Sequence, residues 1–304
     1  MREIYRIRLR ILSTITAIFL LQACQNEPAE NVEIWDRFET QITNTKNYTD
    51  PDGTTLEFWG FYDGENTWTI RFMPDMTGNW KYNASFSDGQ PGKKGNFMCL
   101  PSAIPGMISQ DEVNPIWFGY KGGEHMIMRS FHTGDRFFAE NWPQNKREAF
   151  LDWARQQEYN TLSIGSHYLN RNTGNRGKGW DTPDLWDSTA RRLNEAEYDK
   201  MEVILDDLAK REIIVHPFGG FLGANSDYPN DVLDRTLYFK YTLARLGPYW
   251  NVMLNVAGPE LAKWMLSKDE VVKVGKEIQS LDVFNHLLAC HQTTNKNFFK
   301  NQSW

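Results

Sequence analysis

The chain has 304 residues, of which 40% are hydrophobic, 14% aromatic and 24% charged, a composition typical of roughly two globular domains. Its net charge of −6 and its lack of a basic block beyond the first residues disfavour nucleic acid as a partner. The 12 tryptophans are informative because a sugar can stack on a flat indole ring, although most buried tryptophans serve as core or interface anchors.

Residues 1–23 have the pattern of an export signal, in which several arginines precede a short apolar run at 11–21. The ending Leu21-Gln22-Ala23-Cys24 matches a bacterial lipobox, which predicts cleavage before Cys24 and lipid attachment to its sulfur. The alternative is an ordinary signal with an accidental cysteine. We expect an exported protein, anchored by lipid at Cys24 to the outer membrane or cell surface, or facing the periplasm. Residues 24–30 are predicted to be a tether.

The other two cysteines, Cys99 and Cys290, match no zinc or redox spacing. We interpret both as small buried hydrophobic side chains. The sequence predicts no cofactor.

Residues 31–102 are predicted to form a β-sandwich. Apolar and polar residues alternate over 55–59, 68–72 and 80–86, and turn signals such as Asp63-Gly64 separate these runs. Short strands at regular spacing are typical of sandwiches. Two tryptophans in these strands, at 59 and 68, would suit sugar binding if exposed, but core packing is the favoured interpretation.

Residues 103–304 have a different pattern. A two-stranded ribbon is predicted from strands at 115–120 and 125–131. Strands and helices then alternate, which indicates βαβ units and a parallel sheet. The predicted strands are at 159–164, 213–218, 252–254 and 286–291, and the predicted helices are at 146–158, 194–211, 231–246 and 268–280. A closed (β/α) barrel needs about 250 residues, so we expect an open sheet or a partial barrel of about five strands.

Four of the six histidines stand at the carboxyl ends of predicted strands. Because the carboxyl ends of parallel strands meet at one face, and that face carries the active site of a barrel, these side chains should converge. For any single histidine, a hydrogen-bonded structural role is the alternative. Imidazole, amide and aromatic groups suit sugar hydroxyls and sugar faces, so the candidate cleft residues are His132, Trp142, His167, Tyr168, His216, His291 and Gln292.

Glu260 follows the short apolar run at 252–254 and a Gly-Pro turn, which places it beyond the carboxyl end of a strand. A carboxyl group there could protonate a glycosidic oxygen. The alternative is that Glu260 only caps the next helix. Hydrolysis also needs a second carboxylate roughly 5–9 Å away. The candidates, none of them directly at a strand end, are Asp135, Glu140, Asp181, Asp184 and Asp227.

A metal centre is another interpretation of converging histidines, since three or four of them would suit zinc. No His-x-His or His-Glu-x-x-His spacing supports it. We therefore predict no metal site.

The segments 58–64, 67–68, 71–74 and 78–82 resemble an immunoglobulin-like domain of unknown function that precedes glycoside-hydrolase barrels in secreted bacterial proteins. Residues 114–304 are similar to such barrels, of the apiosidase-like and clan A kind. The second resemblance is carried by His132, His216-Pro217-Phe218 and Ala257-Gly258-Pro259-Glu260. It implies a retaining glycosidase of polysaccharide degradation, with Glu260 as acid/base and a carboxylate nucleophile after the seventh strand.

The chain departs from this pattern in three places. Pro259 stands where clan A members usually have Asn, and the sandwich is short near 48–53, where the family usually has another strand. The strand-seven nucleophile has no counterpart before residue 304. We therefore expect a truncated chain with little or no hydrolase activity. A non-catalytic, surface glycan-binding lipoprotein is the rival hypothesis.

Overall fold

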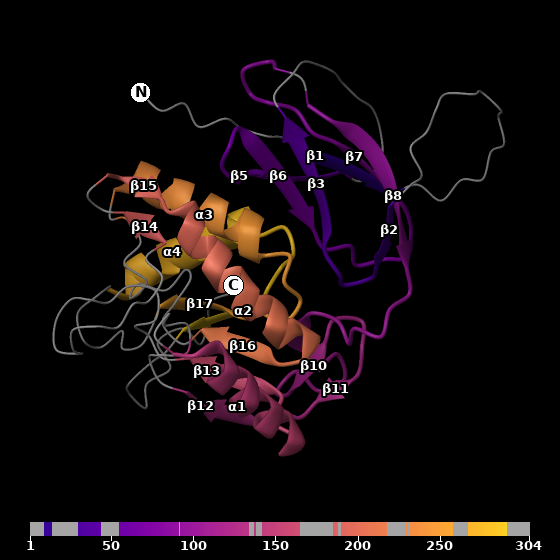
Figure 1. The fold of residues 1–304 in the computed structure, drawn as a ribbon, viewed down its shortest axis with the longest axis vertical. Helices are drawn as coiled ribbons and strands as arrows, with labels where there is room; N and C mark the ends of the chain where they lie inside the picture. Colours follow the sequence, from indigo (N-terminus) through magenta and orange to yellow (C-terminus); the bar gives the residue numbers. More distant parts are fainter. Residues whose placement is uncertain are drawn as a thin grey trace. The chain divides into compact units, whose positions relative to one another are not determined.

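The computed structural model describes residues 9–13, 30–43, 55–90, 92–133, 137, 142–164, 185–187, 190–217, 229, 231–257 and 267–290. The chain divides into two compact units, Met1–Ile104 and Pro105–Trp304. Figure 1 traces both units with their elements labelled. The domain boundary predicted between residues 102 and 103 lies two residues earlier than this division.

The first unit contains two sheets. The larger has the strand order β2-β8-β7-β1-β4, in which β2 pairs parallel with β8 and the other neighbours are antiparallel. The smaller is antiparallel, with the order β3-β6-β5. The strands are β1 (Leu9–Ser13), β2 (Glu30–Glu33), β3 (Phe38–Thr43), β4 (Thr55–Phe58), β5 (Phe61–Tyr62), β6 (Thr67–Phe72), β7 (Gly78–Asn83) and β8 (Lys94–Leu100).

Aromatic side chains fill the space between these two sheets. Phe38 of β3 stacks on Phe97 of β8 with ring centroids 4.1 Å apart, and Phe72 of β6 lies 5.2 Å from Trp80 of β7. All four side chains are buried. The unit is therefore the β-sandwich that strand alternation predicts, since period-2 patterning sends every second side chain to the core. Trp68 is half-buried against Tyr62 and Phe86 rather than displayed as an open platform.

One strand of the sandwich comes from an unexpected part of the chain. The sequence assigns residues 9–13 to an export signal, whereas Leu9–Ser13 forms β1, antiparallel to both β4 and β7. Main-chain pairing explains this position, because β1 satisfies the hydrogen-bonding edges of two strands at once.

The second unit begins with a three-stranded antiparallel sheet of order β11-β10-β9. Its strands are β9 (Ile108–Gln110), β10 (Phe118–Tyr120) and β11 (His125–Met126). The single strand predicted at 125–131 is wrong, because β11 ends at Met126 and β12 (Ser130–His132) starts a different sheet. Asn160 holds this break: its side chain donates to the Ile127 carbonyl (2.9 Å) and accepts from the Arg129 amide (2.8 Å).

The core of the second unit is parallel. β12, β13 (Thr161–Ile164) and β16 (Ile214–Pro217) pair in that order, and Val252 forms a parallel bridge to Val215 of β16. Next along the chain, β17 (Leu254–Ala257) pairs parallel with β18 (Leu288–Cys290). The strands follow one another in chain order, as in the first part of a (β/α) barrel.

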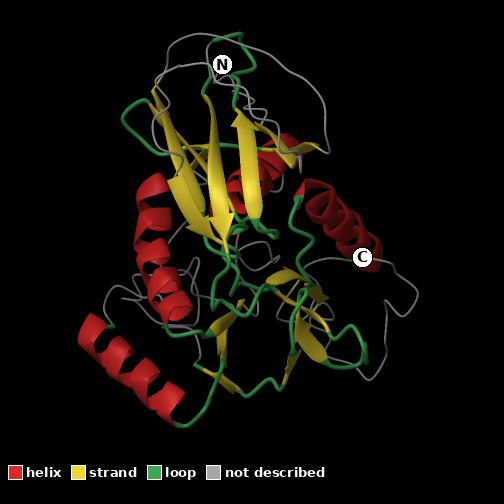
Figure 2. Ribbon diagram, turned by 90° about the vertical axis from the view of Figure 1, so that its right-hand side faces the viewer, coloured by secondary structure: helices red, strands yellow, loops and turns green. Residues whose placement is uncertain are grey.

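Helices connect these strands, and Figure 2 shows them in red beside the yellow strands. They are α1 (Gln144–Gln156), α2 (Glu195–Lys210), α3 (Val232–Leu246) and α4 (Lys268–Leu281), and a short hairpin of β14 (Trp186–Asp187) and β15 (Arg192–Leu193) precedes α2. Among the described residues, none of the helices has the length and apolar character needed to cross a membrane.

Two helix faces test the predicted periodicity. In α2, the predicted core positions Met201, Ile204, Leu205 and Leu208 are all buried. In α1, the predicted face of Phe150, Trp153 and Ala154 is partly wrong, because Trp153 is 48% exposed. The buried row of α1 is instead Arg147, Leu151 and Ala154, at the i, i+4, i+7 spacing of one helix face.

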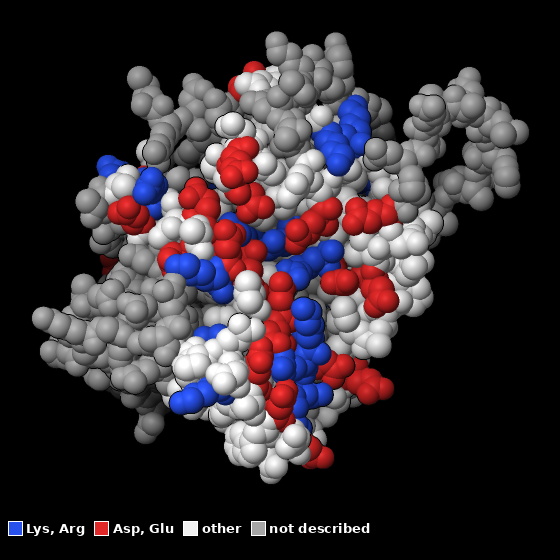
Figure 3. Space-filling model, viewed as in Figure 1, with Lys and Arg blue, Asp and Glu red and all other residues white. Residues whose placement is uncertain are grey.

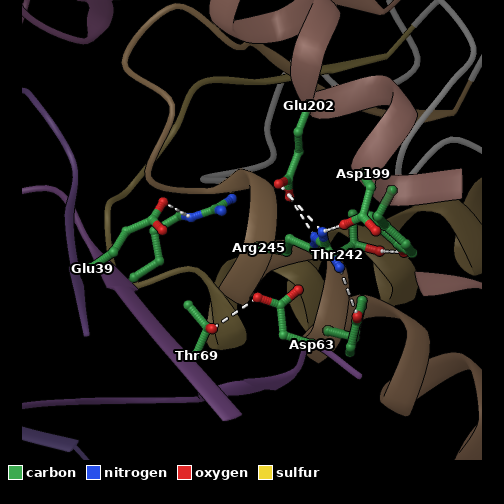
Figure 4. Close-up of polar contacts among 10 residues, drawn as sticks. Glu39, Asp63, Thr69, Asp199, Glu202, Thr242 and Arg245 are labelled. Carbon is green, nitrogen blue, oxygen red and sulfur yellow. Dashed lines mark hydrogen bonds and ion pairs between the residues drawn. The ribbon is translucent and has the colours of Figure 1, made fainter. Parts of the chain in front are cut away.

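A charge cluster around the buried Arg245 joins α2 to α3. Arg245 of α3 contacts Glu202 and Asp199 of α2, as Figure 4 shows. It also donates to the Tyr241 hydroxyl at 3.0 Å. Burial alone would lower the pKa of Arg245, but hydrogen bonding and the negative charge of Glu202 outweigh it and raise the pKa. The guanidinium therefore stays charged inside the unit, held by its partners.

Candidate functional site

Three polar side chains form a row across the parallel sheet. In the register of the sheet His132 is opposite Ser163, and Ser163 is opposite His216. In-register neighbours of a parallel sheet point to the same face, so the three side chains lie side by side. The row sits at or next to the last residue of each strand, which is the carboxyl end of the sheet.

A hydrogen bond links two members of this row. Nδ1 of His132 lies 3.2 Å from Oγ of Ser163. The next residue reinforces the same contact, because the Thr133 amide donates to the Ser163 carbonyl at 3.0 Å. The end of β12 is thus fixed to β13 through both main chain and side chain. His132 is exposed, and Ser163 and His216 are half-buried, so the row is open to a ligand on one side.

The opposite face of these strands is packed against helices. Leu162 and Val215, which neighbour the row in sequence, are fully buried. Phe131 contacts the ring of Phe150 on α1, with centroids 5.1 Å apart. Because alternate residues of a strand face opposite sides, the contact of Phe131 with α1 turns His132, and the row in register with it, to the other face.

Glu260 and four cleft candidates lie outside the described residues. β17 ends at Ala257, three positions before Glu260 in the sequence. The candidates His167 and Tyr168 follow the end of β13, and His291 and Gln292 follow the end of β18. All five possible second carboxylates, at 135, 140, 181, 184 and 227, also lie outside the described residues.

Trp142, one of the candidate cleft residues, packs beside helix α1. Its ring contacts those of Phe137 and Phe150, at centroid distances of 5.5 and 5.9 Å, and the guanidinium carbon of Arg147 lies 5.9 Å from its centroid. Together with residues of α1 and α2 it lines a groove of about 520 Å³. These contacts place the ring beside α1.

The two remaining histidines pair with aspartates. Nδ1 of His125, on β11, lies 2.9 Å from Oδ2 of Asp111. Nδ1 of His286 lies 2.9 Å from Oδ1 of Asp282, and both of these side chains are buried. Neither pair is at the carboxyl end of the parallel strands β12, β13, β16, β17 or β18. They are structural contacts that shape the loops before β12 and β18.

The side chains of this row are suited to hydrogen bonding with a ligand. Imidazole nitrogens and a hydroxyl both donate and accept, as sugar hydroxyl groups require. No cluster of three or more His, Cys, Asp or Glu side chains able to hold a metal is found among the described residues. Burial raises the pKa of Cys290, at the end of β18, to about 12, so its thiol stays protonated and is a poor nucleophile.

On the surface viewed in Figure 3, acidic and basic side chains intermingle. Two ion pairs on helical surfaces of the second unit are Arg211 with Asp152 (2.9 Å) and Arg155 with Glu212 (3.1 Å). Such surface pairs contribute little to stability.

Sequence reasoning missed Ser163. A serine near the end of a strand belongs to no motif. The only signal in the sequence is that Ser163 stands two residues after Thr161, so that both side chains point to the same face of the strand. Its importance comes from the register that sets it between two histidines.

Comparison with solved structures shows what fold the chain resembles. A structure from Bacteroides vulgatus, provisionally described as a glycoside hydrolase, superimposes with a TM-score of 0.72 at 21% identity. The match covers 90% of this chain and 58% of that one, so this chain spans less than two thirds of its length. The fold is thus glycoside-hydrolase-like.

A second structure from the same species, of a glycoside hydrolase family 5 protein, has a TM-score of 0.48 at 17% identity and covers 67% of this chain and 44% of that one. That score is too low to carry an argument. The family model of a domain of unknown function, DUF5060, matches residues 19–87, which begin after β1. No curated protein matches the sequence.

Proposed function

We propose that the protein is a glycoside-hydrolase-like protein of polysaccharide degradation that binds its sugar at the carboxyl ends of β12, β13, β16 and β17. The observation that carries this proposal is the in-register row of His132, Ser163 and His216 on a glycoside-hydrolase-like fold. In barrels of this class, residues at the ends of different strands converge on one ligand.

Glu260 is the proposed general acid/base. Its place after β17 suits a carboxyl group that protonates the leaving glycosidic oxygen and then activates water, as a retaining mechanism requires. The histidine row would hold the sugar hydroxyls and orient the glycosidic bond. Double displacement also needs a carboxylate nucleophile. Because none of the candidate carboxylates stands directly at a predicted strand end, we propose that the chain is inactive or impaired as a hydrolase.

The test combines titration and turnover. Plant and bacterial oligosaccharides are titrated calorimetrically against the chain, and reducing ends are measured for every ligand that binds. Glu260→Gln should abolish any hydrolysis while leaving binding within about twofold, because an acid/base acts on the transition state. Glu195→Gln, in the first turn of α2, is the matched control. Hydrolysis unchanged in Glu260→Gln would contradict the assignment.

The alternative function is a non-catalytic glycan-binding lipoprotein, favoured by the same hydrogen-bonding row. Binding without turnover in the unmodified chain, unaffected by Glu260→Gln, would support it. Failure of every oligosaccharide to bind would argue against both functions.

We also propose that the sandwich is of the immunoglobulin-like type. Separately, we propose a lipid anchor at Cys24, at the outer membrane or cell surface, because residues 21–24 match a lipobox. Cys24 lies outside the described residues. The intact mass of the protein from its native host tests the anchor. An acylated chain beginning at Cys24 is the expected result, and an unprocessed or unacylated chain would exclude it.

A further inference from the structure

The position of β1 in its sheet is unusual for the topology of the chain. β1 lies between β7 and β4, whereas β2, the next strand in sequence, lies at the opposite edge of the same sheet. In sequence, β2 and β3 come between β1 and its sheet neighbours β4 and β7, so no tight hairpin ties β1 to either neighbour. Its place depends on pairing and not on a turn.

β1 pairs along its length with both neighbours. Ile11, at its centre, is opposite Leu56 of β4 and Tyr82 of β7. Within the described residues, β1 is also the only sheet neighbour of β4. Withdrawing β1 would leave β4 without a main-chain partner and expose one edge of β7. Unpaired edges of this kind bind extended peptides.

Ring contacts among the other strands of the sandwich also hold its two sheets together. Phe58 of β4 packs on Phe72 of β6, with ring centroids 5.3 Å apart, and Phe97 of β8 packs on Phe38 of β3. These ring contacts join the two sheets across the interior. They would keep β4 and β7 near their places and so preserve a slot between them.

We propose that the slot between β4 and β7 is a strand-binding site, whose occupant is the chain's own segment Leu9–Ser13. The ligand class is an extended peptide, held antiparallel to both edges by its main chain. A chain processed before Cys24 would lose this occupant and present an open slot. The proposal is independent of the glycosidase function.

The test uses the full chain, produced without export so that residues 1–23 remain. A specific protease site is introduced within 14–29, and β1 is left unchanged. After cleavage, the short N-terminal fragment should co-elute with the remainder in gel filtration and separate only in denaturant. Amides of Gly78–Asn83 and Thr55–Phe58 should keep their protection from hydrogen exchange. Immediate separation of the fragment without denaturant would overturn the proposal.

A competition experiment tests the ligand class. A labelled synthetic peptide with the sequence of residues 7–15 should displace the cut fragment, whereas the same peptide with Ile11→Pro should not, because proline removes a ladder N–H in the middle of a sheet. Equal displacement by both peptides would show that main-chain pairing is not the basis of binding.

A variant of the intact chain gives a second readout. Ile11→Pro should lower the melting temperature of the sandwich by at least about 5 °C, and Ile11→Val should lower it much less, because only proline breaks the pairing. If both variants melt like the unmodified chain, β1 does not hold the sheet. If Ile11→Pro fails to fold, the cleavage experiment still decides the question, since it leaves β1 intact.

Discussion

His132 and Ser163 are joined by a hydrogen bond of 3.2 Å between Nδ1 and Oγ, on adjacent parallel strands. The contact fixes the imidazole at the open end of the sheet. The His132 side chain is exposed there.

Ser163→Ala should therefore weaken oligosaccharide binding by about 3- to 10-fold, the loss expected for one neutral hydrogen bond. His132→Ala should cost more, because it removes the ligand-facing group as well. Isothermal titration calorimetry measures both. Ser280→Ala, at the end of α4, is the control and should bind normally. A Ser163→Ala variant with unchanged affinity would show that the hydroxyl does not position His132.

Arg245 should be critical for the stability of the second unit. Arg245→Met leaves Glu202 buried without its cation, and breaking a buried ion pair from one side costs about 3–5 kcal/mol of unfolding free energy. Urea denaturation followed by circular dichroism measures the loss.

The matched control is Arg155→Met, which breaks the exposed pair with Glu212 and should cost no more than about 1 kcal/mol. Adding Glu202→Leu to Arg245→Met should restore part of the stability, because the unpaired carboxylate is gone. Equal losses in Arg245→Met and Arg155→Met would mean that the buried cluster is not important for stability.

The pair of Asp282 and His286 predicts an acid-sensitive loop. Burial by itself would raise the pKa of Asp282, but the charge and hydrogen bonds of His286 outweigh it and hold the pKa below its usual value. A carboxyl group whose folded pKa is depressed stabilises the protein above its unfolded pKa of about 4 and loses that contribution as pH falls through the folded value.

Asp282→Asn should accordingly be less stable than the unmodified chain at pH 7, and the difference should narrow as the pH falls below about 4. Melting temperatures measured between pH 3 and pH 7 test this. Asp269→Asn, on the exposed start of α4, is the control. A difference that stays constant across the range would exclude titration of Asp282 as the cause.

The start of α4 predicts a measurable helix cap. The Ser267 hydroxyl accepts from the Glu270 amide at 3.3 Å, and the Glu270 carboxylate accepts from the Ser267 amide at 2.7 Å. These contacts lower the pKa of Glu270. Ser267→Ala should cost about 1 kcal/mol of unfolding free energy, and Ser267→Asp, which can still cap, should cost less. Equal losses in the two variants would show that capping is not what stabilises this end.

The sequence by itself determined the order and type of the main elements. The apolar spacing of α2 and the alternation in β7 are local, because each depends only on which face of one element is buried. The same local patterns placed His132 and His216 at the ends of strands. They also placed Glu260 after the apolar run at 252–254, of which only Leu254 belongs to β17.

Tertiary structure decided the relationships between elements. The register that sets Ser163 between two histidines, the burial of Arg245, and the insertion of Leu9–Ser13 between β4 and β7 all join residues far apart in sequence. Trp142 likewise lies beside α1 because of its packing against Phe137 and Phe150. The periodicity of one segment cannot specify its partners, because pairing and packing depend on which other surfaces need covering.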